Sequence, residues 1–190
     1  MIAGPNGAGK STIVRRFNRG RLPVVNPDEI ARAIDPARIN ERSVQLQAGR
    51  QALAERTRRI AARESFAVET TMSGHSELAV MREAKELGFK VNLVFVGLVR
   101  ADLSDNRVAL RVRQGGHDVP TADTERRFDR IMANLPLAIR LADRAILLDN
   151  SGRRPRLVAV LESGRAPRVV ERLPDWGRVA LAEANQSPSA

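Results

Sequence analysis

The stretch GPNGAGKST at residues 4–12 constrains the fold more than any other part of the sequence. It fits the phosphate-loop pattern G-x-x-x-x-G-K-[ST] at every fixed position. Glycines let a loop turn its backbone N–H groups toward phosphate oxygens, and the positive N-terminal end of the following helix adds to the attraction. The pattern predicts a strand, a loop and a helix that bind ATP through Gly4, Asn6, Gly7, Ala8, Gly9, Lys10, Ser11 and Thr12.

Two side chains of this loop carry the expected phosphate chemistry. Lys10 is expected to reach the β- and γ-phosphates, and the hydroxyl of Ser11 to bind Mg²⁺. A chance glycine-rich turn is the alternative, but the helical pattern STIVRRF follows the loop directly. An ABC-type ATPase is a poor match, because no LSGGQ signature is present and Asn150 stands where a catalytic glutamate would follow AILLD.

The rest of the chain alternates short apolar runs with longer helical stretches, which predicts an α/β P-loop fold with a five-stranded, mostly parallel sheet covered by helices. Strands are expected at 22–26, 66–70, 91–99 and 145–149. Helices are expected to begin at Ser11, Pro27, near Arg42, at Glu77, near Leu103 and at Glu125. Only MIA precedes the loop, so the first strand is either short or preceded by further residues.

The C-terminal part has a different pattern. Residues 150–173 are expected to form a small antiparallel β addition, because two apolar runs flank a turn that contains Ser and Gly. We expect one kinase-like domain over residues 1–183 and a disordered tail over 184–190.

The amino-acid composition limits the kinds of molecule that this chain is expected to bind. The chain has 190 residues, no cysteine and a formal net charge of +10. The arginines are spread along the sequence and aromatic residues make up only 3%, which argues against a nucleic-acid partner. No apolar stretch has the ~20 residues of a membrane span, so a cytoplasmic location is expected.

The segment NPDEIA poses the main question about chemistry. Asn26, Pro27 and Glu29 are sufficient to start a helix, as N-cap, first-turn proline and capping-box acid. Asp28 is not needed for that start, and it follows a strand at the edge where open α/β sheets bind ligands. We therefore predict that Asp28 is a general base for an acceptor hydroxyl, with a role in the helix start as the alternative.

Two further groups are candidates. Glu69 ends a predicted strand, where it can bind sugar hydroxyls or help to hold Mg²⁺; the alternative is a solvated loop acid with Ser73 capping the next helix. Arginines cluster around a Gly115–Gly116 hinge and could close over the γ-phosphate, or form a solvated basic face. These arginines are Arg111, Arg113, Arg126, Arg127 and Arg130.

The chain resembles the zeta toxins and their close relatives, which are described as P-loop kinases. The resemblance runs from residue 3 to 151 through GPNGAGKST, NPDEIAR, AVETTMSG, RVALRVRQGGHDVP, ERRFDRIMANLP and LLDNS. Well-studied zeta toxins use ATP and Mg²⁺ to phosphorylate a hydroxyl of UDP-N-acetylglucosamine, and a small antitoxin protein holds the toxins inactive. The resemblance implies the same class of reaction and partner for this chain.

The resemblance also implies roles for single residues. Lys10 and Ser11 match the ATP-site lysine and hydroxyl, and Asp28 matches the acid that acts on the acceptor. Glu69 and Thr70 fall where acceptor contacts lie. Arg111 and Arg126 fall near the lid arginines, with Arg107, Arg113 and Arg127 as competitors.

The expected function is transfer of the ATP γ-phosphoryl group to a small-molecule hydroxyl, with a nucleotide sugar as the leading candidate. A polynucleotide kinase is one alternative, because it would use the positive charge and also needs an aspartate base. A non-catalytic, ATP-gated interaction module is the other.

Overall fold

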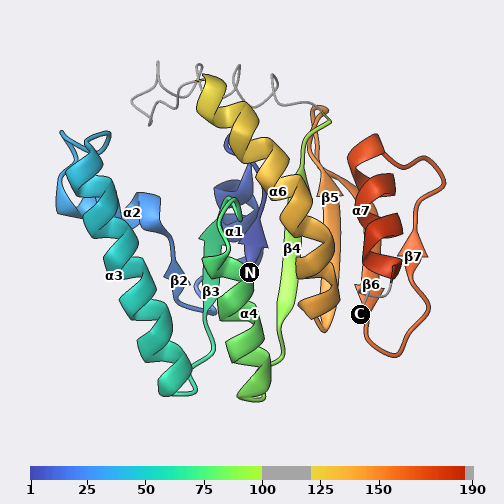
Figure 1. Ribbon diagram of the computed structural model, residues 1–190, viewed down its shortest axis with the longest axis horizontal. Helices are drawn as coiled ribbons and strands as arrows, with labels where there is room; N and C mark the ends of the chain where they lie inside the picture. Colours follow the sequence, from blue (N-terminus) through green and yellow to red (C-terminus); the bar gives the residue numbers. More distant parts are fainter. Residues whose placement is uncertain (100–120, 187–190) are drawn as a thin grey trace.

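The structure is a computed structural model that describes residues 1–99 and 121–186. In these ranges it contains a seven-stranded sheet and six helices (Figure 1). The strands are β1 (Ile2–Ala3), β2 (Val24–Val25), β3 (Ala67–Thr70), β4 (Asn92–Gly97), β5 (Arg144–Asp149), β6 (Arg156–Glu162) and β7 (Arg168–Val169). The helices are α1 (Lys10–Asn18), α2 (Pro27–Ile34), α3 (Arg42–Ala61), α4 (Ser76–Glu86), α6 (Thr121–Leu141) and α7 (Asp175–Asn185).

The sheet order is β2-β3-β1-β4-β5-β6-β7. The first five strands in this order are parallel to their neighbours, whereas β6 and β7 run antiparallel. This confirms the predicted α/β fold and its antiparallel C-terminal addition. Because β3 lies between β2 and β1 and runs parallel to both, the segments that follow these three strands meet at one edge of the sheet, where ligands bind in open α/β folds.

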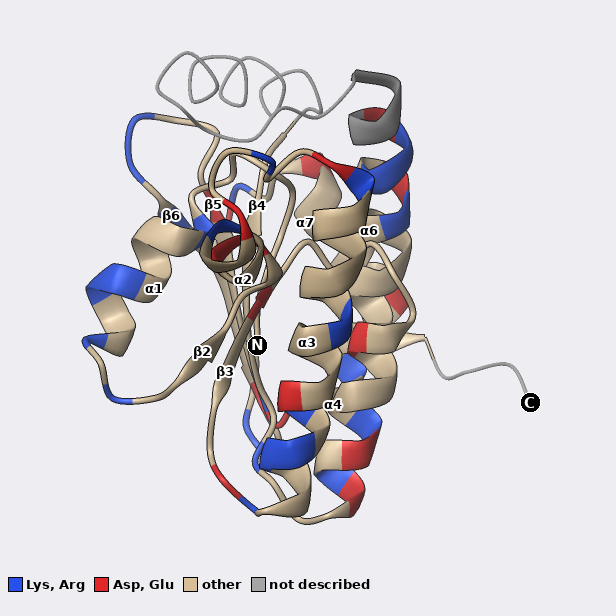
Figure 2. Ribbon diagram, turned by 90° about the vertical axis from the view of Figure 1, so that its left-hand side faces the viewer, with Lys and Arg blue, Asp and Glu red and all other residues tan. Residues whose placement is uncertain are grey.

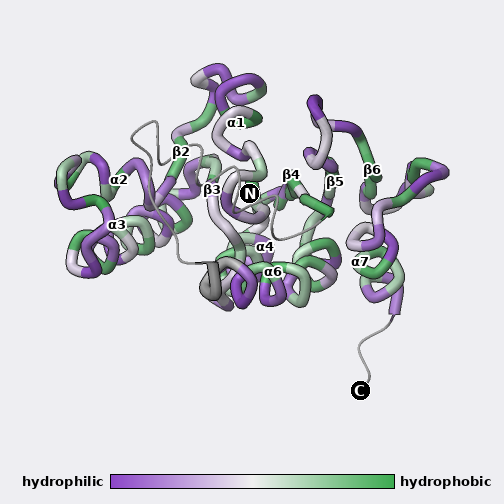
Figure 3. The backbone as a smooth tube through the Cα atoms, turned by 90° about the horizontal axis from the view of Figure 1, so that it is seen from above, coloured by the Kyte–Doolittle hydropathy of each residue, from purple (hydrophilic) through white to green (hydrophobic). Residues whose placement is uncertain are grey.

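Helices cover the sheet on both faces. Helix α1 lies on one face, and α3, α4, α6 and α7 lie on the other (Figures 2 and 3). The larger core packs Leu93, Phe95 and Leu147 against α4, α6 and α7. A smaller core under α1 contains Ile13, Val96 and Leu98. Neighbouring β4 residues thus face opposite ways, as strand geometry requires.

Helix α7 was not predicted. It packs Trp176, Ala180 and Leu181 into the larger core and ends at Asn185, beyond residue 184 where the tail was expected to begin. Residues 187–190 lie outside the described residues. None of the helices that the structure describes is long and apolar enough to cross a membrane.

A substitution at Gly97 tests the packing of α7. A Cβ atom at Gly97 would lie 2.4 Å from Cζ2 of Trp176, so the indole ring leaves no room for a methyl group. We expect Gly97→Ala to lower the free energy of unfolding by about 1–3 kcal/mol, measured by urea denaturation.

Gly49→Ala is the matched control for this prediction, because Gly49 lies within α3 and a Cβ atom there meets nothing within 4 Å. It is expected to raise stability by about 0.5–1 kcal/mol, since alanine is the better helix former. Equal effects of the two substitutions would contradict the packing argument.

Candidate active site

The loop between β1 and α1 is shaped by its glycines. Gly7 and Gly9 have φ of 69° and 91°, in the left-handed region that glycine adopts at little cost. Gly4 packs so tightly on β4 that a Cβ atom would lie 2.2 Å from the carbonyl oxygen of Val96. The fixed glycines of the motif are therefore required by backbone geometry.

The loop ends at an open helix terminus. Gly9 is the N-cap of α1, and no side chain caps the first N–H groups of this helix. Lys10 is buried, and its Nζ donates to the carbonyl oxygen of Pro5 at 3.0 Å. An uncapped helix N-terminus beside a lysine is a site for an anion.

The segment after β2 begins α2 as predicted. Asn26 is the N-cap, and its Oδ1 accepts a hydrogen bond from the backbone N–H of Asp28 at 2.9 Å. Pro27 is the first helical residue. The side chain of Asp28 is exposed, and in the described part of the chain no hydrogen bond or ion pair engages its carboxylate. Asn26 therefore supplies the side-chain cap, and the Asp28 carboxylate is available for another role.

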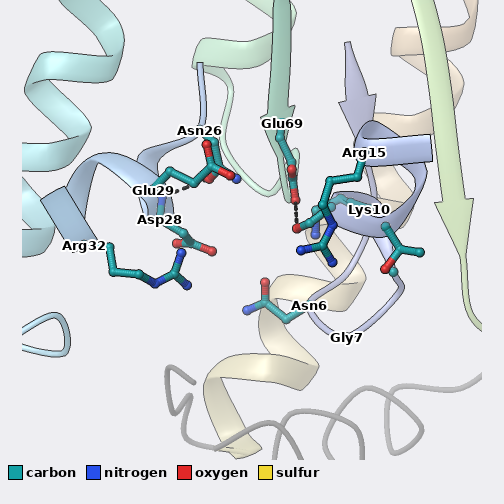
Figure 4. Close-up of a pocket in the computed structure, with 12 residues that line it drawn as sticks. Asn6, Gly7, Lys10, Arg15, Asn26, Asp28, Glu29, Arg32 and Glu69 are labelled. Atoms are coloured by element: carbon teal, nitrogen blue, oxygen red, sulfur yellow. Dashed lines mark hydrogen bonds between the residues drawn. The ribbon is translucent and has the colours of Figure 1, made fainter. Parts of the chain in front are cut away.

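One cavity of about 330 Å³ brings these parts together. It is lined by the phosphate loop, the first turns of α1 and α2, and Glu69 at the end of β3 (Figure 4). Of the residues predicted to contact nucleotide, Gly4 and Ala8 do not line it; both are buried residues of the loop.

Two arginines that line the cavity were missed by the sequence analysis, and Asn26 and Glu29, which also line it, were predicted only to start a helix. Arg15 and Arg32 both line the cavity. Each follows a predicted site residue by four positions, Ser11 in α1 and Asp28 in α2, and this spacing puts both members of a pair on one helix face. The signal was therefore in the sequence. Figure 4 shows the Arg32 guanidinium directed toward the same space as the Asp28 carboxylate.

Glu69 is a buried acid that contacts the phosphate loop. The residue is 6% exposed, and its Oε1 accepts a hydrogen bond of 2.6 Å from the Ser11 hydroxyl. The alternative of a solvated loop acid is therefore wrong. Ser73 does not cap α4 either, because this helix begins at Ser76 and the Ser73 hydroxyl bonds to that of Thr71.

Thr70 faces away from this cavity. Its hydroxyl donates to Glu77 Oε1 at 3.0 Å and accepts from the backbone N–H of Met72 at 3.1 Å. Arg56 of α3 lies 3.8 Å from the same carboxylate, and burial holds the pKa of Arg56 below its usual value while Glu77 opposes that shift. Glu69 and Thr70, which were predicted together as acceptor contacts, thus lie on opposite faces of β3, because consecutive strand residues point to opposite sides.

The predicted lid arginines are only partly described. Arg126 lies in the N-terminal part of α6, is exposed and does not line the cavity. Arg127 and Arg130 also lie in α6 and do not line the cavity. The remaining lid positions, together with the helix expected near Leu103, lie outside the described residues; these positions are Arg107, Arg111, Arg113, Gly115 and Gly116.

Asp149, the acid at the end of β5, makes structural contacts. Asp149 is buried, accepts from the Ser151 hydroxyl at 2.6 Å and forms an ion pair of 2.9 Å with Arg156. Strand β4 separates it from the strand that carries the phosphate loop, whereas β3 with Glu69 is a direct neighbour of that strand.

Solved structures share this fold. A complex titled AvrRxo1-ORF1:-ORF2 with ATP matches with a TM-score of 0.69 at 17% identity, covering 100% of this chain and 65% of that chain. The PezAT chromosomal toxin–antitoxin system of Streptococcus pneumoniae matches with a TM-score of 0.60 at 16% identity, covering 97% of this chain and 85% of that chain. A putative kinase from Chloroflexus aurantiacus matches with a TM-score of 0.52 at 19% identity, covering 68% of this chain and 77% of that chain.

Sequence comparisons agree with the fold. An uncharacterized protein of Haemophilus influenzae is 39% identical over 118 residues, which is 62% of this chain and 82% of that protein. The family model described as AAA domain matches residues 1–137. The chain therefore belongs to the AAA domain family, with a nucleotide-binding phosphate loop and the fold of a zeta-toxin-like P-loop kinase.

Proposed function

We propose that this protein is an ATP-dependent kinase that transfers the γ-phosphoryl group to a hydroxyl of a small molecule. The observation that carries the proposal is the shared cavity of Lys10, Ser11 and Asp28. A nucleotide held by the phosphate loop and an acceptor beside Asp28 would occupy one space. The carboxylate could then take the proton of the attacking hydroxyl, which the catalytic-loop aspartate does in protein kinases.

The phosphate side of the cavity is built from α1. Its uncapped first N–H groups would hold phosphate oxygens, and Lys10 would exchange its contact with the Pro5 carbonyl for one with the β- and γ-phosphates. Arg126 and Arg111 remain proposed contributors to the neutralisation of charge on the transferred group.

Mg²⁺ suits the residues beside the phosphate loop. The hydroxyl of Ser11 and the carboxylate of Glu69 are hard oxygen donors 2.6 Å apart, which is the ligand chemistry that Mg²⁺ prefers. The described residues contain no cluster of three or more metal-ligating side chains, so phosphate oxygens and water would complete the shell. When bound, the ion would neutralise charge on the β- and γ-phosphates.

A substitution at Glu69 tests the proposed Mg²⁺ role. Glu69→Gln keeps the size of the side chain but removes its charge, so we expect the Mg²⁺ concentration at half-maximal rate to rise by about tenfold or more. The measurement is a Mg²⁺ titration of initial rates at saturating ATP. An unchanged Mg²⁺ dependence with a raised KM for the acceptor would instead support the predicted acceptor contact.

The acceptor side of the cavity carries charges of both signs, since Arg32 lines it together with Asp28 and Glu29. Arg32 of α2 lies beside Asp28, whereas Arg15 of α1 lies beside Lys10 on the phosphate side (Figure 4), and no ion pair engages either arginine within the described ranges. A guanidinium group beside Asp28 favours an acceptor that carries phosphate. A nucleotide sugar such as UDP-N-acetylglucosamine meets this requirement and agrees with the resemblance to zeta toxins.

A protein partner is also proposed. Two of the solved structures that share the fold are a two-protein complex and a toxin–antitoxin system. A small antitoxin protein would be the corresponding partner here. A nucleic-acid partner is not favoured, because arginines of α3 are already engaged by acids: Arg58 and Arg59 pair with Glu55 at 2.9 and 2.7 Å.

Mass spectrometry of reaction products tests the proposed function. The protein is incubated with ATP, Mg²⁺ and a pool of metabolites that includes UDP-N-acetylglucosamine, beside an Asp28→Asn variant. A phosphorylated species made only by the parent would support the kinase and identify its acceptor. Bound ATP without any phosphorylated product would favour an ATP-gated interaction module, and labelling of oligonucleotide ends would favour a polynucleotide kinase.

A further inference from the structure

The residue that follows β5 reaches the phosphate loop. Asn150 donates from Nδ2 to the carbonyl oxygen of Ala8 at 2.8 Å, although the two residues are 142 positions apart in the sequence. Its backbone N–H donates to the carbonyl oxygen of Gly97 at 3.0 Å, which ties it to the end of β4. The side chain is therefore anchored on the sheet while its amide group holds the loop.

This hydrogen bond sets the orientation of one peptide group. The described chain contains no cis peptide bond, so the carbonyl of Ala8 and the N–H of Gly9 point in opposite directions across a planar trans peptide. Because the carbonyl is held toward Asn150, the Gly9 N–H is directed away from Asn150. Gly9 lines the cavity, whereas Asn150 does not.

A glycine-flanked loop needs such a restraint. Gly7 and Gly9 both have positive φ, and glycine adopts positive and negative φ with similar ease. The peptide between Ala8 and Gly9 could therefore rotate and turn its carbonyl oxygen toward the phosphates. The amide of Asn150 also sits directly against Gly9, since a Cβ atom there would lie 2.7 Å from Nδ2.

We propose that Asn150 is a positioning residue for nucleotide binding, which holds the Ala8–Gly9 peptide so that the Gly9 N–H is presented to a nucleotide phosphate. Asn150 acts through the loop and need not touch the nucleotide itself. The proposal depends on nucleotide binding alone, and it holds whether or not the protein transfers a phosphoryl group.

Calorimetric titration with ADP and AMP at pH 8 tests the proposal. Asn150→Asp keeps the size of the side chain but replaces the donor with an oxygen that repels the Ala8 carbonyl. The loop is expected to hold the outer phosphates, so the Kd for ADP should rise about 10- to 100-fold. AMP lacks the β-phosphate, and its Kd should change by less than about twofold.

Ser151→Ala is the control in the same turn. The Ser151 hydroxyl donates to Asp149 Oδ1 and accepts from the backbone N–H of Val99, so its loss should affect stability more than the preference for ADP. Unfolding temperatures are measured for every variant. If Asn150→Asp does not fold, Asn150→Ala and Asn150→Ser provide the same comparison.

Two results would overturn the proposal. The first is ADP binding by the folded Asn150 variants at the affinity of the parent. The second is an equal loss of ADP and AMP affinity, shared by Ser151→Ala, because that pattern would make Asn150 a purely structural residue. Absence of any phosphorylated product in the mass-spectrometric assay would leave this comparison unaffected.

Discussion

Replacement of Asp28 by asparagine is expected to lower kcat by about 10²- to 10⁴-fold, which is the usual contribution of a general base. The substitution keeps the size of the side chain and removes its ability to accept a proton. The cap of α2 is retained, because Asn26 Oδ1 bonds to the backbone N–H of residue 28. Only the favourable interaction of a negative charge with the helix dipole is lost, about 0.3–1 kcal/mol.

Glu29→Gln is the matched control for this prediction. Glu29 is the next residue of α2, lines the same cavity and would lose the same charge. We expect its kcat to exceed that of Asp28→Asn by at least about tenfold, because a merely electrostatic contribution is smaller than proton transfer. Initial rates with the identified acceptor and ATP titrations provide the comparison. Equal losses in the two variants would mean that Asp28 contributes only charge.

The features that sequence reasoning predicted well are local. The glycine positions, the open start of α1 and the Asn26 cap each depend on a few consecutive residues. Backbone conformation at such positions follows from residue type, because glycine permits positive φ and asparagine satisfies first-turn N–H groups. The parallel strands were also predicted from a local pattern, because strands buried on both faces are continuous apolar runs in the sequence.

The features that the sequence analysis did not predict depend on contacts between residues far apart in the sequence. The hydrogen bond between Ser11 and Glu69 spans 58 residues and depends on β3 lying beside β1. The contact from Asn150 to Ala8 likewise requires the position of β5 in the sheet. No local pattern carries this information. Helix α7 was missed because no element was predicted between the β addition, which ends at residue 173, and the tail, which was expected to begin at residue 184.

Two other results could have been deduced from the sequence. Glu69 and Thr70 are consecutive residues of one strand, so they could not both face the cavity. Arg15 and Arg32 follow Ser11 and Asp28 by one helical turn, so they had to share the faces of those residues. Periodicity alone would have excluded Thr70 from the cavity lining and added Arg15 and Arg32 to it.

Replacement of Lys10 by methionine is expected to lower kcat/KM for ATP by about 10²- to 10³-fold or more, because a charge that stabilises the transferring phosphates is lost. Methionine fills similar space, so the buried position of Lys10 should remain packed. Lys10→Arg should also be poorly active, because a planar guanidinium does not fit where a compact ammonium contacts the Pro5 carbonyl. Rates and ATP affinity are measured for both variants.

Lys85→Met provides the control, because it removes the same charge elsewhere. Lys85 Nζ bonds to Asp143 Oδ1 at 2.9 Å and to the Leu141 carbonyl, and it holds the pKa of Asp143 below its usual value. This depressed pKa contributes stability at neutral pH that is lost as pH falls through the acid range. Lys85→Met should therefore cost up to about 1 kcal/mol of stability at neutral pH and leave phosphoryl transfer intact. The two variants differ only in the position of the lost charge. Activity retained by Lys10→Met, or an equal loss of activity in Lys85→Met, would therefore show that the lysine of the loop does not act on the phosphates.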